Sequence, residues 1–313
     1  MRIEKQEIFI SVVIPVYQSE KTLGELFIRV KKVLEKIGKN YEIIFIDDGS
    51  LDDSWKKLEE IFNKNNHVRV IQLTQNYGQH NALMCGFANS KGKYAVTLDD
   101  DLQNPPEEIP KIISKIKQGY DVVYGEYVYK NHPFFRNLGS SLIQLLYKKI
   151  FQINGNLTSF RIIRREFVDK LLIYNRNYIF IDGLLAWHTK NIGYVKVRHG
   201  KRNIGKSGYN FSKLIQLSLN MLTNFSIFPL QLATIIGFTL SILGLFMAIF
   251  IVIKKIFFDI PVTGFASTIV TITIFSGAQL ITIGLIGEYI GRIHLNINNK
   301  PQYQVRNMKE KSK

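Results

Sequence analysis

Two long stretches without a charged side chain constrain this chain more than any other feature of its sequence. Residues 214–253 and residues 260–287 contain no Asp, Glu, Lys or Arg. Each stretch is longer than the roughly 20 apolar residues that cross a bilayer as a helix. The sequence therefore predicts two transmembrane helices, at 229–253 and 264–287. Two buried helices of a soluble core are the less favoured alternative, because core segments are usually shorter.

The distribution of basic residues predicts on which side of the membrane the chain's ends lie. The apolar run 8–17 is too short for a signal peptide and lacks a small-residue cleavage site. From residue 292 onward there are six Lys and Arg against Glu310, which suits a cytoplasmic end. Lys254 and Lys255 fall in the outer loop, against this rule, but they are few beside the basic excess elsewhere. We therefore expect an inner-membrane protein with both termini in the cytoplasm.

The formal net charge of +16 admits two interpretations. A strongly basic chain can bind nucleic acid, or it can face the anionic inner leaflet and anionic ligands. We favour the second and expect no nucleic-acid partner, because the sequence contains no nucleic-acid-binding motif. The lone Cys85 permits no internal disulfide, which fits a reducing compartment.

The first part of the chain alternates short β-rich runs with helical segments. Strands are expected at 10–17, 41–50, 68–74, 93–100 and 121–127, and helices at 22–38, 52–64, 80–90 and 106–119. This alternation predicts an α/β domain whose parallel sheet is covered on both faces. In such sheets, ligands bind beyond the carboxyl ends of the strands.

Polar residues follow three of these strands at that edge. Tyr17 ends the first strand, Asp47 and Asp48 end the second, and the Asp run 99–101 ends the fourth. An ordinary turn before the next helix would also explain Asp47 and Asp48. The second acidic cluster favours a functional role for this edge.

The acidic run has the composition of a divalent-cation site. Asp99 and Asp101 are expected to point into the same region, and Gln103 adds a neutral oxygen; oxygen ligands suit Mg²⁺ or Mn²⁺. Asp100 should point to the other side of the strand end, so we do not count it as a ligand. Such a site suits cleavage of a nucleotide diphosphate. The sequence has neither the G-x-G-x-x-G fingerprint nor a P-loop motif.

Several of these segments together resemble glycosyltransferase family 2, which has the GT-A fold. The resemblance rests on VVIPVY, IIFIDDGSLDDS, LDDDLQNPPEEIP, NYGQHNALMCGF, GKSGYNFSKL and IGLIGEYIGRIHLNINNKPQY. Within the family, the chain is most similar to the polyprenyl-phosphate sugar transferases, which include dolichol-phosphate mannose synthase. It looks most like the bacterial branch that contains the undecaprenyl-phosphate aminoarabinose transferase.

The resemblance implies roles at matching positions. Residues of the donor site would border the nucleotide, contact its base or ribose, and hold the metal and diphosphate. The nucleotide would be bordered by Pro15 and Tyr17 and contacted by Asp48 and Asp99, and the metal would be held by Asp99, Asp101 and Gln103. Asp99 and Asp101 would also be the catalytic residues.

A second set of residues would bind the two phosphate-bearing substrates. Arg136 and Ser140 would meet the lipid phosphate, and Arg202, Lys206 and Ser207 would close over the phosphates. Arg136 has an alternative role as a basic residue at the membrane surface, and Lys206 as a solvated loop lysine.

The chain departs from the family pattern at several positions. The family often has the sequence Pro-Val-Tyr-Asn-Glu, whereas in this chain the last two residues of that motif are Gln18 and Ser19. The family also has Asp-Ala-Asp, whereas this chain has Asp100 in place of the alanine. Many members carry an Arg after the fifth strand, where this chain has Glu126 and Tyr127. Lys130 would then supply the charge. The segment 156–166 also differs, which leaves the identity of the sugar open.

The remaining segments predict the domain organisation. We expect a GT-A domain at 1–208, an amphipathic helix at 209–228, two transmembrane helices within 229–291 and a basic tail at 292–313. Apolar stripes at 134–153 and 210–225 suit helices in the headgroup region, or else helices that cover the GT-A core.

Close packing and pairing are also expected near the end of the second span. Gly287 and Gly291 would let helices approach closely, and Glu288 and Arg292 are spaced to form an ion pair. The resemblance suggests a homotetramer.

The expected function is transfer of one sugar from a nucleotide sugar to undecaprenyl phosphate. The bacterial resemblance favours a UDP-sugar donor and a product for the cell envelope. In-line attack by the lipid phosphate would invert the anomeric centre. The alternatives are a transferase of the same fold that acts on a lipid-linked glycan, and a non-catalytic membrane scaffold.

Overall fold

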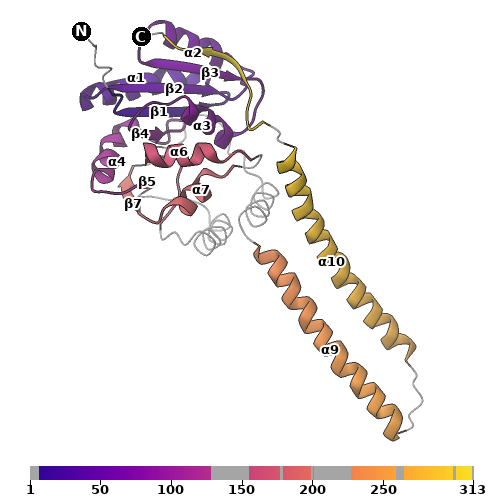
Figure 1. The fold of residues 1–313 in the computed structure, drawn as a ribbon. Coiled ribbons are helices and arrows are strands. Elements are labelled where there is room, and N and C mark those ends of the chain that lie inside the picture. The colour runs from indigo at the N-terminus through magenta and orange to yellow at the C-terminus, as the bar shows by residue number, and fades with distance from the viewer. Residues whose placement is uncertain are drawn as a thin grey trace. The chain divides into compact units, whose positions relative to one another are not determined.

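The computed structural model describes residues 7–127, 155–176, 179–198, 200, 227–258, 264–298 and 301–311. The chain divides into two compact units. One unit is formed by Met1–Gly208 together with Lys300–Lys313, and the other by Tyr209–Asn299. Figure 1 shows the sheet and its helices in the first unit and two long helices in the second.

The first unit is built on a mixed sheet of eight strands in the order β7-β5-β6-β4-β1-β2-β3-β8. The strands are β1 (Ile10–Val16), β2 (Tyr41–Asp47), β3 (Val68–Leu73), β4 (Tyr94–Thr97), β5 (Val122–Tyr127), β6 (Arg161–Arg164), β7 (Ile192–Val197) and β8 (Val305–Lys309). Strands β1 to β4 are mutually parallel, and β6 and β8 run antiparallel to their neighbours. The carboxyl ends of β1 to β4 therefore lie along one edge, as the sequence predicts.

Helices cover both faces of this sheet. One face packs on α1 (Glu20–Ile37), α2 (Ser54–Asn63) and α4 (Ile109–Ile116). On the other face, α3 (Gln79–Ala88) packs on β1 and β2 and lies beside α6 (Arg165–Ile173). Helix α7 (Ile181–His188) packs on α6. Strand β1 is buried along its whole length, as expected for a parallel strand between two helical layers.

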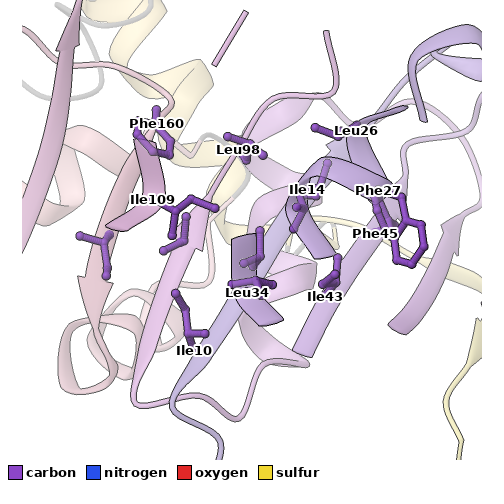
Figure 2. Packing of buried hydrophobic residues seen from close by; sticks show 14 of the residues in the cluster. Ile10, Ile14, Leu26, Phe27, Leu34, Ile43, Phe45, Leu98, Ile109 and Phe160 are labelled. Carbon is purple, nitrogen blue, oxygen red and sulfur yellow. The ribbon is translucent and has the colours of Figure 1, made fainter. Parts of the chain in front are cut away.

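The hydrophobic core lies between the sheet and the first of these helical layers. Figure 2 shows side chains from β1, β2 and α1 packed together, among them Ile10, Ile14, Ile43, Phe45, Leu26, Phe27 and Leu34. The expected helix at 106–119 is divided, with a 3-10 turn at Pro106–Glu108 before α4. This core holds the strand ends of β1, β2 and β4 in fixed relative positions.

The end of the chain differs from the expected basic tail at 292–313. Helix α10 continues through Ile297, and β8 then joins the sheet as an edge strand beside β3. Glu310, just after β8, pairs with Arg69 of β3 and with Lys91. Charged residues are common on edge strands because they discourage pairing with other chains, and they also hide a strand's apolar periodicity.

The second unit contains α9 (Phe228–Phe258) and α10 (Phe265–Ile297). Segments Phe228–Lys254 and Thr268–Ile297 are long and apolar enough to cross a membrane. Helix α10 extends past 287, the predicted end of the second span. Arg292 Nη2 lies 2.5 Å from Glu288 Oε1, so this predicted pair is confirmed. The expected amphipathic helices at 134–153 and 210–225 lie outside the described residues.

Candidate active site

The carboxylate of Asp48 holds the loop that leads into α3. Tyr77 N donates to Asp48 Oδ1 at 2.7 Å, and Gly78 N donates to Oδ2 at 2.8 Å. Asp48 is only 3% exposed. Asp48, at the end of β2, therefore ties this strand to the loop after β3 at the carboxyl edge of the sheet.

Asp47 closes an ordinary turn after β2, which is one of the two explanations that the sequence allows for Asp47 and Asp48. Ser50 N donates to Asp47 Oδ1 at 3.1 Å. Gly49 has a φ of +69°, and a side chain there would meet the backbone of Gln75 at 2.5 Å. The turn after β2 therefore needs glycine for its conformation and for the close approach of the loop after β3.

Pro15 and Tyr17 lie at the end of β1. Pro15 pairs with Ile46 of β2, beyond the last residue pair that joins β1 to β4, so its lack of an N–H interrupts no pairing with β4. Tyr17 is 43% exposed and follows the strand directly. An aromatic side chain is therefore available to a ligand at this edge.

Three side chains hold the carboxylate of Asp99. Gln79 Nε2 donates to Oδ1 at 2.6 Å, and Asn104 Nδ2 donates to Oδ2 at 3.1 Å. Ser159 Oγ also donates to Oδ2. Because these donors come from three separate segments, the orientation of the carboxylate is fixed. Outer hydrogen bonds of this kind orient metal-ligating carboxylates in proteins.

The loop after β4 brings Asp101 and Gln103 to the same region. Gln103 N donates to Asp101 Oδ1 at 3.0 Å, which closes a tight turn. Leu102, between them, adopts a φ of +62°, which is unusual for a residue other than glycine. Gly200 N donates to the carbonyl oxygen of Gln103 at 2.8 Å. The chain after β7 therefore returns to this loop.

Asp100 contacts the loop after β1. Its Oδ2 accepts hydrogen bonds from Tyr17 N at 3.0 Å and from Ser19 Oγ at 2.5 Å. Burial raises the pKa of Asp100 to about 6, although both hydrogen bonds act in the opposite direction. Asp100 thus joins the loop after β4 to the loop after β1.

Negative charge is concentrated along this edge. Burial raises the pKa values of Asp47, Asp48 and Asp99 as well as that of Asp100. The proximity of Asp101 raises the pKa of Asp99 further, whereas Ser159 and Arg161 lower it. A bound cation would favour the ionised form of these carboxyl groups.

A buried ion pair between Arg161 and Asp182 lies close enough to Asp99 for the charge of Arg161 to lower the pKa of that carboxyl. Arg161 of β6 is 1% exposed and contacts Asp182 of α7, whose Oδ1 also accepts a hydrogen bond from Tyr124 Oη at 2.9 Å. His80 stands near this pair, with its ring 5.5 Å from the ring of Phe180. Burial lowers the pKa of His80 to about 4, so the imidazole is neutral at pH 7.

The donor chemistry of the acidic loop fits a divalent cation. Carboxylates and an amide are the hard oxygen ligands that Mg²⁺ and Mn²⁺ take, usually together with waters and phosphate oxygens. Among the described residues, no group of three or more His, Cys, Asp or Glu is arranged around a common point. Two carboxylates and Gln103 would therefore leave coordination positions for a substrate diphosphate.

The expected phosphate-binding residues lie outside the described part of the chain. They are Lys130, Arg136, Ser140, Arg202, Lys206 and Ser207. The described residues nearest to them in sequence lie at the same edge of the sheet. Gly200 contacts Gln103, as given above, and Tyr127 Oη donates to Asn104 Oδ1 at 2.8 Å.

The residues that hold Asp99 carry no recognisable signal in the sequence. Asn104 lies within the quoted LDDDLQNPPEEIP segment, but a buried amide there has no distinguishing signal. Ser159 is 60 residues away from Asp99 in the sequence. Gln79 lies in the quoted NYGQHNALMCGF segment, but nothing in that segment marks its amide as a partner of Asp99. Their roles depend on contacts between distant segments.

Comparison with known proteins agrees with this geometry. The chain matches the model of glycosyl transferase family 2 over residues 11–173. It is 36% identical over 299 residues to a Proteus mirabilis protein named undecaprenyl-phosphate 4-deoxy-4-formamido-L-arabinose transferase, covering 94% of this chain and 92% of that protein. A protein of the same name from Shewanella sediminis is 36% identical over 305 residues, covering 96% of this chain and 92% of that protein.

A solved structure shares the fold at lower sequence identity. Glucosyl-3-phosphoglycerate synthase from Mycobacterium tuberculosis, in complex with Mn²⁺, UDP and phosphoglyceric acid, is 19% identical with a TM-score of 0.53. The match covers 69% of this chain and 76% of that chain. The predicted GT-A-like architecture is therefore confirmed. The family model matches more than half of the chain and the relatives are 36% identical across most of it, so this protein is a glycosyltransferase that belongs to family 2.

Proposed function

We propose that the protein is a membrane-bound, inverting transferase that moves one sugar from a nucleotide sugar to undecaprenyl phosphate. The preferred donor is a UDP-sugar, and the product is a polyprenyl-phosphate sugar for cell-envelope glycan or lipid modification. The observation that carries the proposal is the extent of the similarity to transferases named for undecaprenyl phosphate. Only 6% of the chain lies outside the alignment, so the similarity must extend into both apolar helices.

In this proposal the donor nucleotide lies at the ends of β1 and β2. Pro15 and Tyr17 border it, and the exposure of Tyr17 leaves its ring free to contact a base or ribose. Asp48 has both carboxylate oxygens engaged by backbone amides. Its contribution is therefore to hold the Tyr77–Gly78 loop beside the nucleotide, in addition to any contact of its own.

We infer that Asp99, Asp101 and Gln103 hold a divalent cation, Mg²⁺ or Mn²⁺, together with the donor diphosphate. When bound, the cation would offset the negative charge on the leaving nucleoside diphosphate. The hydrogen bonds to Asp99 support this assignment because they fix the carboxylate before any ligand arrives.

The acceptor needs little activation by the protein. A lipid phosphate is already anionic at neutral pH, so attack on the anomeric carbon requires no strong general base. The protein must instead position two anionic substrates and offset their repulsion. Arg136 and Ser140 are proposed for the lipid phosphate, and Arg202, Lys206 and Ser207 are proposed to close over the phosphates. Lys130 would supply the positive charge that many family members carry after the fifth strand. The contact of Gly200 with Gln103 supports the second group, because Arg202 follows two residues later.

The pairing of β8 with β3 supports an even number of membrane crossings. The chain leaves the sheet unit before α9 and re-enters it after α10. If both helices span the membrane, the catalytic domain and both termini lie on one side, and the basic C-terminal residues favour the cytoplasmic side. The homotetramer stays a prediction of the family resemblance.

The proposal is tested with the full-length protein in detergent, undecaprenyl phosphate, Mg²⁺ or Mn²⁺ and a panel of nucleotide sugars. Mass spectrometry should detect one lipid-phosphate sugar, and Asp101→Asn should abolish it. Release of nucleotide only when a lipid-linked glycan replaces the simple lipid phosphate would favour the other acceptor class. No product and no nucleotide release with either acceptor would contradict the proposal.

A further inference from the structure

Two departures from the family pattern lie in direct contact in this protein. Ser19 stands where the family often has Glu, and Asp100 stands where it has Ala. The two positions are 81 residues apart in the sequence, yet Ser19 Oγ donates to Asp100 Oδ2 at 2.5 Å. In this protein the carboxylate at the contact belongs to Asp100, in the loop after β4, whereas in the family pattern a glutamate at position 19 would contribute it from the loop after β1.

The loop after β1 is held by side chains at three successive amides. Tyr17 N donates to Asp100 Oδ2 at 3.0 Å, Gln18 N to Ser50 Oγ at 3.0 Å, and Ser19 N to Ser54 Oγ at 2.9 Å. Ser50 and Ser54 both follow β2, so only Asp100 connects this loop to the loop after β4 through these amides.

The hydroxyl of Ser19 makes this contact and does not cap helix α1. Ser19 precedes α1 at the N-cap position, where a serine hydroxyl normally accepts a hydrogen bond from a backbone amide of the first turn. Here its side chain caps no amide, and the hydroxyl donates to Asp100. A hydrogen bond to a carboxylate is stronger than one between neutral groups.

The backbone on both sides of the contact is held in an unusual conformation. Gln18 has a φ of +53° and Leu102 a φ of +62°, and they are the two non-glycine residues with positive φ in the described part of the chain. Such conformations persist where surrounding contacts over-determine them, and they gather at functional sites. One lies in each of the two loops that Asp100 joins.

We propose that Asp100 is a positioning residue for donor binding, which fixes the Tyr17–Ser19 loop against the Asp99–Gln103 loop in place of the glutamate that the family often has at position 19. This inference rests on the proposed nucleotide-sugar donor. A glutamate at position 19 beside Asp100 would bring two carboxylates together, and such pairs repel. The contact therefore accommodates one carboxylate, from either loop.

The proposal is tested by moving the carboxylate between the loops. The variants are Asp100→Ala, Ser19→Glu and the double variant Ser19→Glu/Asp100→Ala. The control is Asp121→Ala, because Asp121 Oδ2 also accepts a hydroxyl hydrogen bond, from Thr189 Oγ1 at 2.6 Å, but lies before β5 at the opposite edge of the sheet. Calorimetry measures the Kd for UDP and GDP without metal, and a thermal melt of each variant reports folding.

We expect each single variant to weaken binding of the nucleoside diphosphate by about tenfold, as for the loss of a charged hydrogen bond. The double variant should recover to within about threefold of the wild type, because it restores a single carboxylate at the contact. Asp121→Ala should lower the melting temperature and leave the Kd unchanged. In turnover assays, Asp100→Ala should raise the donor KM more than it lowers kcat.

Two results would overturn the inference while the proposed function stands. One is wild-type affinity for nucleotide in Asp100→Ala. The other is a double variant that binds no better than Asp100→Ala although its melting temperature matches the wild type. Failure of the wild-type protein to bind either UDP or GDP, with or without metal, would instead contradict the proposed function itself.

Discussion

The buried ion pair between Arg161 and Asp182 leads to a quantitative prediction about stability. Asp182→Ala would leave the Arg161 guanidinium, 1% exposed, without its carboxylate, and would remove the acceptor of the Tyr124 hydroxyl. Breaking a buried ion pair from one side costs about 3–5 kcal/mol, and a stranded hydroxyl adds about 1 kcal/mol. We expect the free energy of unfolding to fall by about 5 kcal/mol.

The effect is measurable as a melting temperature in detergent. For a domain of this size, 1 kcal/mol corresponds to about 2–4 °C, so Asp182→Ala should melt about 10–20 °C below the wild type. Asp182→Asn keeps an oxygen acceptor for Arg161 and Tyr124, so its melting temperature should lie between the two.

A matched apolar replacement separates the burial of charge from the loss of packing. The triple variant Tyr124→Phe/Arg161→Met/Asp182→Leu removes every polar group of the cluster at similar volume. It should melt well above Asp182→Ala, because replacing a whole buried ion pair by apolar residues is often neutral. The reasoning is refuted if Asp182→Ala melts within about 2 °C of the wild type. It is also refuted if the triple variant melts at a lower temperature than Asp182→Ala.

Three further predictions follow from other parts of the sheet unit. Burial lowers the pKa of His80 from 6.5 to about 4, so at this imidazole only the unfolded state takes up a proton as the pH falls from 7.5 to 5. The contribution of His80 to stability therefore falls in this window by about 2 kcal/mol, and the difference between the wild type and His80→Gln in denaturant titrations at both pH values should report it. Deleting residues 301–313 removes β8 and exposes the edge of β3. The melting temperature should fall, and size-exclusion chromatography should show aggregation that increases with protein concentration. A fully monodisperse product would contradict the protective role of β8 at this edge. A Cβ at Gly86 would lie 2.3 Å from Val13 Cγ1. Gly86→Ala should therefore lower the free energy of unfolding by about 2 kcal/mol in thermal melts. Adding Val13→Ala should recover part of this loss, and no recovery would indicate that α3 shifts to accommodate the new methyl group.

The central part of the fold could be predicted from sequence because its signals are local. Segments 12–16 and 43–46 are wholly apolar, and each is followed by polar residues at the carboxyl edge. Their alternation with amphipathic helices determines a parallel sheet with both faces covered. The same order places Asp48 and the Asp99–Asp101 run at one edge without any knowledge of their contacts.

The outer strands could not be predicted in the same way. Strand β6 has only two apolar residues, Ile162 and Ile163, between arginines, and its burial depends on β4 and β5 on either side. Strand β8 is charged and lies more than 200 residues after its partner β3 in the sequence. Short strands of this kind are stabilised by their neighbours, so local periodicity carries little information about them.

The partners of Asp100 could not be predicted from strand geometry. Alternation along the fourth strand is the basis for expecting it to point away from Asp99 and Asp101, but β4 ends at Thr97 and Asp100 lies in the turn beyond it. Its contact with Tyr17 and Ser19 depends on how the loops after β1 and β4 fold against each other. The donors that fix Asp99 are likewise contributed by α3, by the loop after β4 and by the segment before β6, which the sequence alone does not bring together.

The stoichiometry of the released nucleotide tests the central claim most directly. Transfer of the sugar alone breaks the bond between the anomeric carbon and the donor phosphate, so each undecaprenyl-phosphate sugar formed should be accompanied by one nucleoside diphosphate. The full-length protein should form both in equal amounts from one nucleotide sugar, and Asp101→Asn should form neither. Release of a nucleoside monophosphate with an undecaprenyl diphosphate-linked sugar, or a lipid product that persists in Asp101→Asn, would contradict the account.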